Sequence, residues 1–131
     1  MRKLIITTCF LALSLPALLA QNALSISDKI AEVYGNNYGD TNPEAFRFLK
    51  NLLESRVEIA YTPDLKPSKY TALSSIPVMN KYNTTITGHN PNTFTPQTFN
   101  PLHYQIEFAN TINDQIYWID NTSYLLIIRH Q

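Results

Sequence analysis

The hydrophobic positions at the start of the chain form one continuous run, unlike the periodic patterns that follow. Two basic residues at positions 2 and 3 precede an apolar run over residues 4–15, and the small residue Ala20 ends the segment. This pattern is typical of a secretory signal peptide. An uncleaved membrane anchor is the alternative, but the run is shorter than the about 20 apolar residues that a span needs. We therefore expect a signal peptide of residues 1–20 and a mature chain of residues 21–131.

Apolar residues at intervals of three and four predict two helices in the first part of the mature chain. The first helix covers residues 26–34. Ser25 or Ser27 suits its N-terminal cap, and Gly35 is expected to end it because glycine accepts a left-handed backbone.

The second helix, over residues 43–55, has the clearer start signal. Pro43 suits the first helical position, and Glu44 lies three residues after Thr41, as in a capping box. We therefore expect the side chain of Thr41 or Asn42 to cap this helix.

Alternation of apolar and polar residues predicts strands in the rest of the chain. The predicted strands cover residues 57–62, 104–108, 115–119 and 124–128. The last one is continuously apolar, which is typical of a central or doubly covered strand.

The middle segment, residues 63–102, is rich in proline and asparagine, so we expect turns and at most short strands there, such as 70–75. Within it, residues 84–98 could form a mobile arm. Phe94 and Phe99 favour docking on the core instead, because burial of each ring is worth about 1.5–3 kcal/mol.

These elements predict a single α+β domain. Two N-terminal helices are expected to pack on one face of an antiparallel sheet of four or five strands. The predicted strands 104–108, 115–119 and 124–128 follow one another with short connections, so the sheet is expected to end in a C-terminal β-meander.

Composition and charge narrow the possible partners. The only cysteine, Cys9, lies in the predicted signal peptide, so the mature domain has no disulfide to stabilise it. Loss of Arg2 and Lys3 leaves eight Lys and Arg residues against ten Asp and Glu residues, a net charge of −2. Nucleic acid requires a basic surface and anionic membranes require a basic cluster. We therefore expect neither nucleic-acid binding nor membrane insertion after cleavage.

Aromatic residues on the predicted strands are the candidate ligand-binding residues. If they share an outward face, they would form a platform for a glycan or a protein partner. The alternative is packing in the core, which is the more frequent role of such residues. The four candidates are Tyr104, Tyr117, Trp118 and Tyr124.

Patterns for metal, cofactor or nucleophile chemistry are weak. His103, Gln105 and Glu107 would share one strand face, but positions 103 and 107 would then be about 13 Å apart, too far to share a metal ion. Asp40 and Glu44 resemble part of a calcium loop whose required glycine is missing, so helix-start chemistry explains them better. No G-x-S-x-G elbow or glycine-rich phosphate loop occurs. We expect no metal ion and no cofactor.

Turns also explain two matches to the N-glycosylation pattern, at Asn83 and Asn121. Asparagine is abundant in the mature chain and favours turns.

The sequence predicts a small exported protein, periplasmic or extracellular, that acts as a non-enzymatic binding or interaction module. One alternative is a small hydrolase or metal-dependent enzyme that uses His103, Glu107 or Asp120. Another is a structural subunit that assembles through a free sheet edge, either the 104–108 strand or the C-terminal strand.

Overall fold

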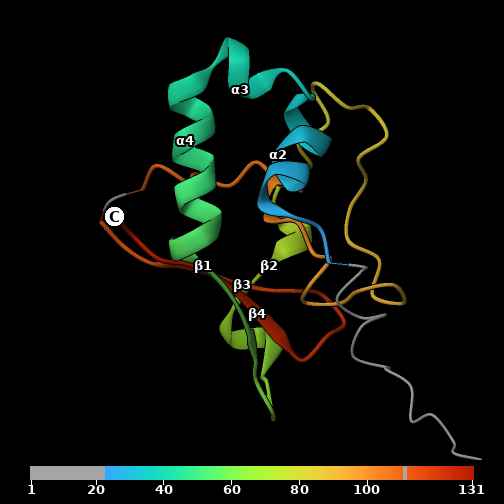
Figure 1. Ribbon diagram of the computed structural model, residues 1–131. Helices are drawn as coiled ribbons and strands as arrows, with labels where there is room; N and C mark the ends of the chain where they lie inside the picture. Colours follow the sequence, from blue (N-terminus) through green and yellow to red (C-terminus); the bar gives the residue numbers. More distant parts are fainter. Residues whose placement is uncertain (1–22, 111) are drawn as a thin grey trace, which may run out of the picture.

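The computed structural model describes residues 23–110 and 112–131. The predicted signal peptide and Cys9 lie outside this range. The described part holds three α-helices and a four-stranded mixed sheet (Figure 1), so the predicted α+β class is confirmed. None of the helices in this part is long and apolar enough to span a membrane.

The first helix, α2 (Ile26–Tyr34), matches its prediction. The Ser25 hydroxyl oxygen accepts the backbone N–H of Asp28 at 3.1 Å, which satisfies one of the free donors of the first turn. Gly35 ends the helix with φ at 98°, a conformation that a side chain would strain. Between the two, Ile30 and Val33 are buried.

The second of the two predicted helices, α4 (Pro43–Asn51), continues as a π-helix, η1 (Leu52–Arg56). Pro43 occupies its first turn as predicted, but neither Thr41 nor Asn42 caps it with a side chain, so the predicted capping box is wrong. A short helix, α3 (Tyr38–Thr41), explains the difference. Thr41 ends α3, and its hydroxyl donates backwards to the carbonyl of Asn37 at 3.2 Å.

The sheet has the strand order β1-β4-β3-β2. Its strands are β1 (Val57–Tyr61), β2 (Thr71–Ala72), β3 (Gln115–Trp118) and β4 (Tyr124–Ile128). β4 pairs antiparallel with β1 and β3, so the prediction of a central C-terminal strand is confirmed. β2 pairs parallel with β3, so the prediction of a wholly antiparallel sheet is wrong.

The parallel pairing places the C-terminal ends of β2 and β3 side by side. Asp120 follows β3, and its carboxylate accepts the backbone N–H of Ser74 at 2.9 Å and the Ser74 hydroxyl at 2.8 Å. Ser74 comes two residues after β2. These contacts fasten two segments that are 46 residues apart, which no local pattern could indicate.

The predicted strand at 104–108 is also wrong, and with it the three-stranded β-meander. Only Tyr104 pairs, in an isolated bridge with Val78. The ladder stops on one side because Pro77 has no N–H to donate to Gln105. It stops on the other side because the N–H of His103 donates to Asn100 within a 3-10 turn. The alternation of burial is nevertheless real, since Tyr104 and Ile106 are buried.

Neither free edge expected for assembly is present. Residues 104–108 form no strand, and β4 lies between β1 and β3. The C-terminal strand therefore offers no unpaired edge to another chain.

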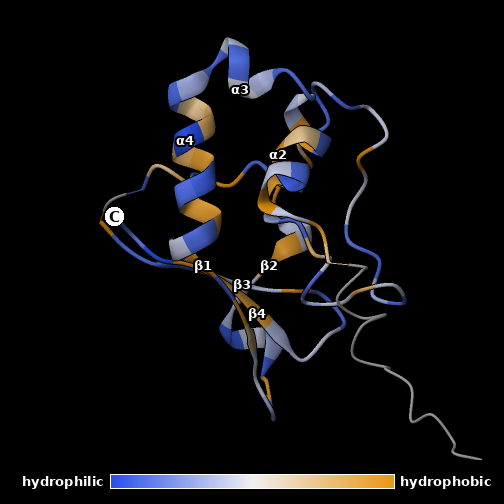
Figure 2. Ribbon diagram, in the orientation of Figure 1, coloured by the Kyte–Doolittle hydropathy of each residue, from blue (hydrophilic) through white to orange (hydrophobic). Residues whose placement is uncertain are grey.

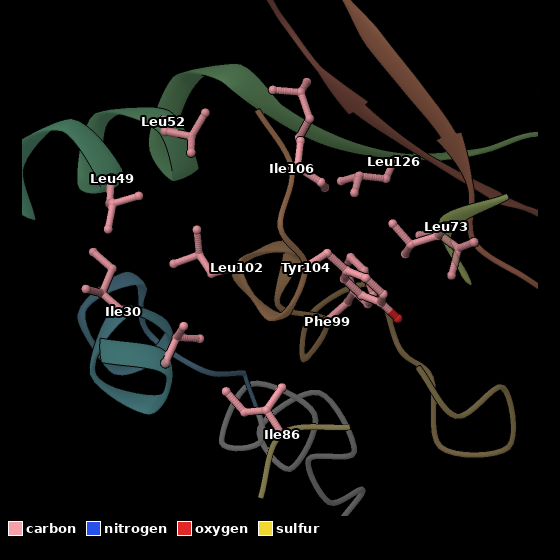
Figure 3. Close-up of a cluster of buried hydrophobic side chains, with 13 residues drawn as sticks. Ile30, Leu49, Leu52, Leu73, Ile86, Phe99, Leu102, Tyr104, Ile106 and Leu126 are labelled. Atoms are coloured by element: carbon pink, nitrogen blue, oxygen red, sulfur yellow. The ribbon is translucent and has the colours of Figure 1, made fainter. Parts of the chain in front are cut away.

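The helices cover one face of the sheet, and the connection between β1 and β2 passes on the other side (Figure 1). Hydrophobic bands alternate with hydrophilic ones along α2 and α4 (Figure 2), as expected for amphipathic helices. Leu102 lies close to Ile30 of α2, Leu49 of α4 and Leu52 of η1 (Figure 3). Burial of each such side chain contributes about 1.5–3 kcal/mol.

The middle segment docks on this core without forming long elements. Phe99 is buried and Phe94 packs against the core, which confirms docking. Asparagine side chains hold the turns by accepting the backbone N–H two residues later. This bond recurs at Asn83, Asn90, Asn100 and Asn110.

Candidate functional site

The candidate site is a cavity of about 310 Å³ between α2 and the segment that docks beside it. We call it the histidine cleft. Glu32 of α2 lines one side, and residues 85–90, 93–95, 98–100, 103 and 104 line the rest.

The Glu32 carboxylate is held from two directions. Its Oε1 lies 2.8 Å from Nε2 of His103, and its Oε2 accepts the side-chain amide of Asn100 at 3.2 Å. His103 closes the 3-10 turn η4 (Pro101–His103), and Asn100 caps that turn by accepting the N–H of Leu102 at 3.1 Å. The contacts therefore fix η4 against α2.

Asn100 is the buried support of this arrangement, with a relative exposure of 1%. Its amide also donates to the backbone carbonyl of Lys29 at 2.9 Å. Both amide hydrogens and the amide oxygen are thus used, as a buried polar group requires.

The ring of His103 keeps one nitrogen available. An ionised carboxylate only accepts hydrogen bonds, so Nε2 of His103 carries the hydrogen that it donates to Glu32. In the neutral ring, Nδ1 is then an acceptor, and no described residue donates to it. Because His103 lines the cavity, its neutral imidazole can offer this nitrogen to a ligand as an acceptor.

Tyr104 supplies a donor. Its hydroxyl oxygen accepts the backbone N–H of His89 at 2.7 Å, which leaves the hydroxyl hydrogen without an acceptor among residues 23–110 and 112–131. Burial raises the pKa of Tyr104, although the hydrogen bond from His89 opposes the shift. The phenol therefore stays protonated at neutral pH and can donate.

Aromatic rings form the apolar part of the wall. Nε2 of His89 donates to the backbone carbonyl of Asp120 at 2.9 Å, which orients the ring. The His89 ring meets Phe94 edge-on, with centroids 5.3 Å apart, and Phe94 meets Phe99 at 5.7 Å. Phe99 is buried and Phe94 is half-buried, so the apolar surface beside the polar groups comes chiefly from Phe94.

This combination suits a neutral ligand that carries hydroxyl groups. Such a ligand can donate to His103 Nδ1, accept from Tyr104 and place its apolar face against the rings of Phe94 and Phe99. Glu32 is the only acidic residue among the described residues of the lining, and its two oxygens are already engaged. In the described part of the chain, no group of three or more His, Cys, Asp or Glu residues could hold a metal ion.

The four aromatic candidates from the sequence do not lie on one surface. Tyr104 is buried and lines the cleft, whereas Tyr117 and Tyr124 pack against the core on the helix side of the sheet. Trp118 follows Tyr117 in β3 and therefore lies on the opposite face, where its indole N–H donates to Thr122 O at 3.0 Å. A role for these four in ligand binding stays a prediction.

The polar candidates are also separated. His103 faces Glu32, whereas the side-chain amide of Gln105 donates to Val78 O at 3.0 Å, and Glu107 is exposed. Asp120 binds Ser74. These residues share no strand face, because the strand that would align them does not form.

The two glycosylation matches occupy turns, as predicted. Asn121 has a left-handed backbone, with φ at 59°, in the turn between β3 and β4. The side-chain amide of Asn83 donates to Glu32 O at 2.8 Å, while its oxygen accepts from Thr85. The nitrogen that a glycan would modify is therefore engaged in a tertiary contact.

The sequence alone does not identify Glu32 and Asn100 as residues of the site. They lie 71 and 3 residues from His103, and only the fold brings all three together. Asn100 before Pro101 is a local signal for a capped turn, but it does not identify Glu32 as the partner. No family model, curated protein or solved structure matches this chain.

Proposed function

We propose that this protein is a small exported, non-enzymatic binding module whose histidine cleft takes a neutral sugar unit. The observation that carries the proposal is the pairing of Glu32 with His103 at 2.8 Å, which fixes the ring of a histidine that lines the cleft. Neither Nδ1 of His103 nor the hydroxyl hydrogen of Tyr104 has a hydrogen-bond partner among the described residues.

A sugar hydroxyl group both donates and accepts, so it can pair with each of these groups. The carbon-bound hydrogens of the sugar ring provide an apolar face for Phe94 and Phe99. A volume of about 310 Å³ is at the lower end of the range for small-molecule pockets, which fits one or two sugar units rather than a protein segment.

Binding is favoured over catalysis by the surroundings of His103. Histidine in a hydrolase usually activates a nucleophile within hydrogen-bond reach. Among the described residues, the only side-chain hydrogen-bond partner of the His103 ring is Glu32. The pair then orients a recognition group rather than activating a hydroxyl or thiol.

Thermal unfolding in the presence of sugars tests this proposal. Residues 21–131 would be heated with glucose, xylose, mannose, N-acetylglucosamine and their β-1,4-linked tetrasaccharides. A sugar that binds only the folded state raises the temperature midpoint of unfolding. At a sugar concentration of 100 times its Kd, the free energy of unfolding rises by about 2.7 kcal/mol. An unchanged midpoint with every sugar would contradict the proposal.

Export is tested separately by the N-terminus of the protein made in its own cells. We expect the mature protein to begin at Gln21 and to occur in the periplasm or medium. A cytoplasmic protein that retains Met1 would contradict export without affecting the binding proposal.

A further inference from the structure

A second cavity, of about 390 Å³, lies beside the C-terminal end of α2. We call it the tyrosine pocket. It is lined chiefly by three tyrosines and three asparagines: Tyr34, Tyr38, Tyr82, Asn36, Asn37 and Asn42.

The three tyrosines form one cluster. The rings of Tyr34 and Tyr38 are stacked, with centroids 4.6 Å apart, and Tyr82 lies 5.8 Å from Tyr34 at a tilt of 43°. Tyr34 and Tyr38 are half-buried, whereas Tyr82 is 60% exposed. Burial, followed by the neighbouring phenols, raises the pKa of Tyr34, so its hydroxyl stays a neutral donor.

The asparagines complete a polar but uncharged lining. Asn36 and Asn37 are exposed, and no described residue makes a hydrogen bond with either side-chain amide. Each amide offers two donors and an acceptor. Among the described residues, none of those that line the tyrosine pocket is charged, and the nearby ammonium of Lys81 lies 5.2 Å from the centroid of the Tyr82 ring.

The tyrosine pocket and the histidine cleft are joined by one short segment. Tyr82 lines the pocket and Thr85 lines the cleft, so their Cα atoms are at most about 11 Å apart. Between them, Asn83 donates to the Glu32 carbonyl at 2.8 Å, which fastens this segment to α2. The two cavities are therefore bordered by one continuous segment of the chain.

We propose that the tyrosine pocket is a second sugar-binding subsite, so that the ligand is an oligosaccharide that extends from the histidine cleft. This inference rests on the proposed function. It adds that the aromatic rings and free amides beside α2 bind further units of the same neutral chain.

Calorimetric titration of a monosaccharide and its tetrasaccharide tests the inference. The probes are glucose with cellotetraose, xylose with xylotetraose, and N-acetylglucosamine with chitotetraose. Tyr82→Ala removes the exposed ring of the pocket, and Tyr61→Ala is the matched control, because Tyr61 is 65% exposed and lines neither cavity. Thermal unfolding checks that both variants remain folded.

We expect the preferred tetrasaccharide to bind wild type about tenfold more tightly than its monosaccharide. Tyr82→Ala should remove most of this difference without weakening monosaccharide binding, and Tyr61→Ala should change neither affinity. Equal affinity for both probes, or a Tyr82→Ala variant with full tetrasaccharide affinity, would overturn the second subsite and leave the cleft proposal standing. Wild-type protein that binds none of the probes would overturn both.

Discussion

Glu32 and His103 meet at 2.8 Å although 71 positions separate them in the chain. The contact joins α2 to the 3-10 turn η4 and lies on the wall of the histidine cleft. The side-chain amide of buried Asn100 donates to the second carboxylate oxygen of Glu32. One contact thus fixes the docking of the middle segment and the orientation of the imidazole that we assign to ligand recognition.

Asn100→Ala should lower the free energy of unfolding by about 2–4 kcal/mol. The substitution removes the donors to Lys29 O and to Glu32 and leaves buried polar groups without partners. Urea denaturation measures the change. Asn90→Ala is the control, because its side chain accepts the same kind of turn bond at an exposed position and should cost about 1 kcal/mol or less. Equal losses for the two variants would contradict the supporting role of Asn100.

Arg56→Met should destabilise the fold by about 2–4 kcal/mol. Arg56 is 7% exposed, and its guanidinium donates to Arg129 O, just after β4, at 2.8 Å and to Phe108 O at 3.0 Å. Arg56→Lys should lose most of the same stability, since lysine lacks the planar fork. Urea denaturation measures both losses.

Exposed Arg47 on α4 provides the control for the Arg56 variants. Arg47→Met removes the same charge at the surface, and its free energy of unfolding should stay within about 0.5 kcal/mol of wild type. A similar loss for Arg47→Met and Arg56→Met would show that the charge matters, and not the buried contacts.

Asp114 should make stability depend on pH in the acid range. The backbone N–H and the ring of His130, with a further contact from Arg129, lower the pKa of this carboxyl from 3.8 to about 2. The folded state thus favours the ionised form, so the stabilisation is complete above about pH 4 and is lost as the pH falls through about 2. Asp114→Asn should therefore flatten this part of the stability profile.

Urea denaturation of wild type and Asp114→Asn from pH 2 to pH 6 measures this effect. Asp40→Asn controls for the change in net charge, because Asp40 is exposed and makes no side-chain hydrogen bond or ion pair with the described residues. Parallel profiles for wild type and Asp114→Asn would contradict the assignment.

The elements that were predicted correctly are those whose signal lies within one stretch of sequence. Ser25 and Gly35 bound α2, and alternation or continuous apolarity identifies β1, β3 and β4. The prediction of a strand over residues 104–108 was wrong, because alternation indicates which side chains are buried and not which backbone groups are paired. Pro77, nearly thirty residues earlier, is part of the reason that no ladder forms there.

The candidate site could not be predicted from the sequence. Its residues are far apart in the chain, and each one looks like a common helix or turn residue. Glu32 looks like a polar position on an amphipathic helix, and Asn100 looks like a turn residue before Pro101. Nothing local indicates that the two meet. The aromatic candidates were chosen from predicted strands, whereas the rings of the cleft, Phe94 and Phe99, come from the irregular segment between them.

Sugar binding by His103→Ala compared with His130→Ala decides whether the histidine cleft is the binding site. Both histidines contact a carboxylate, Glu32 for His103 and Asp114 for His130, but only His103 lines the cleft. Calorimetry with the sugar that most stabilises wild type should give an affinity about tenfold weaker for His103→Ala and unchanged for His130→Ala. Wild-type affinity in a folded His103→Ala variant would contradict the assignment of the histidine cleft as the binding site.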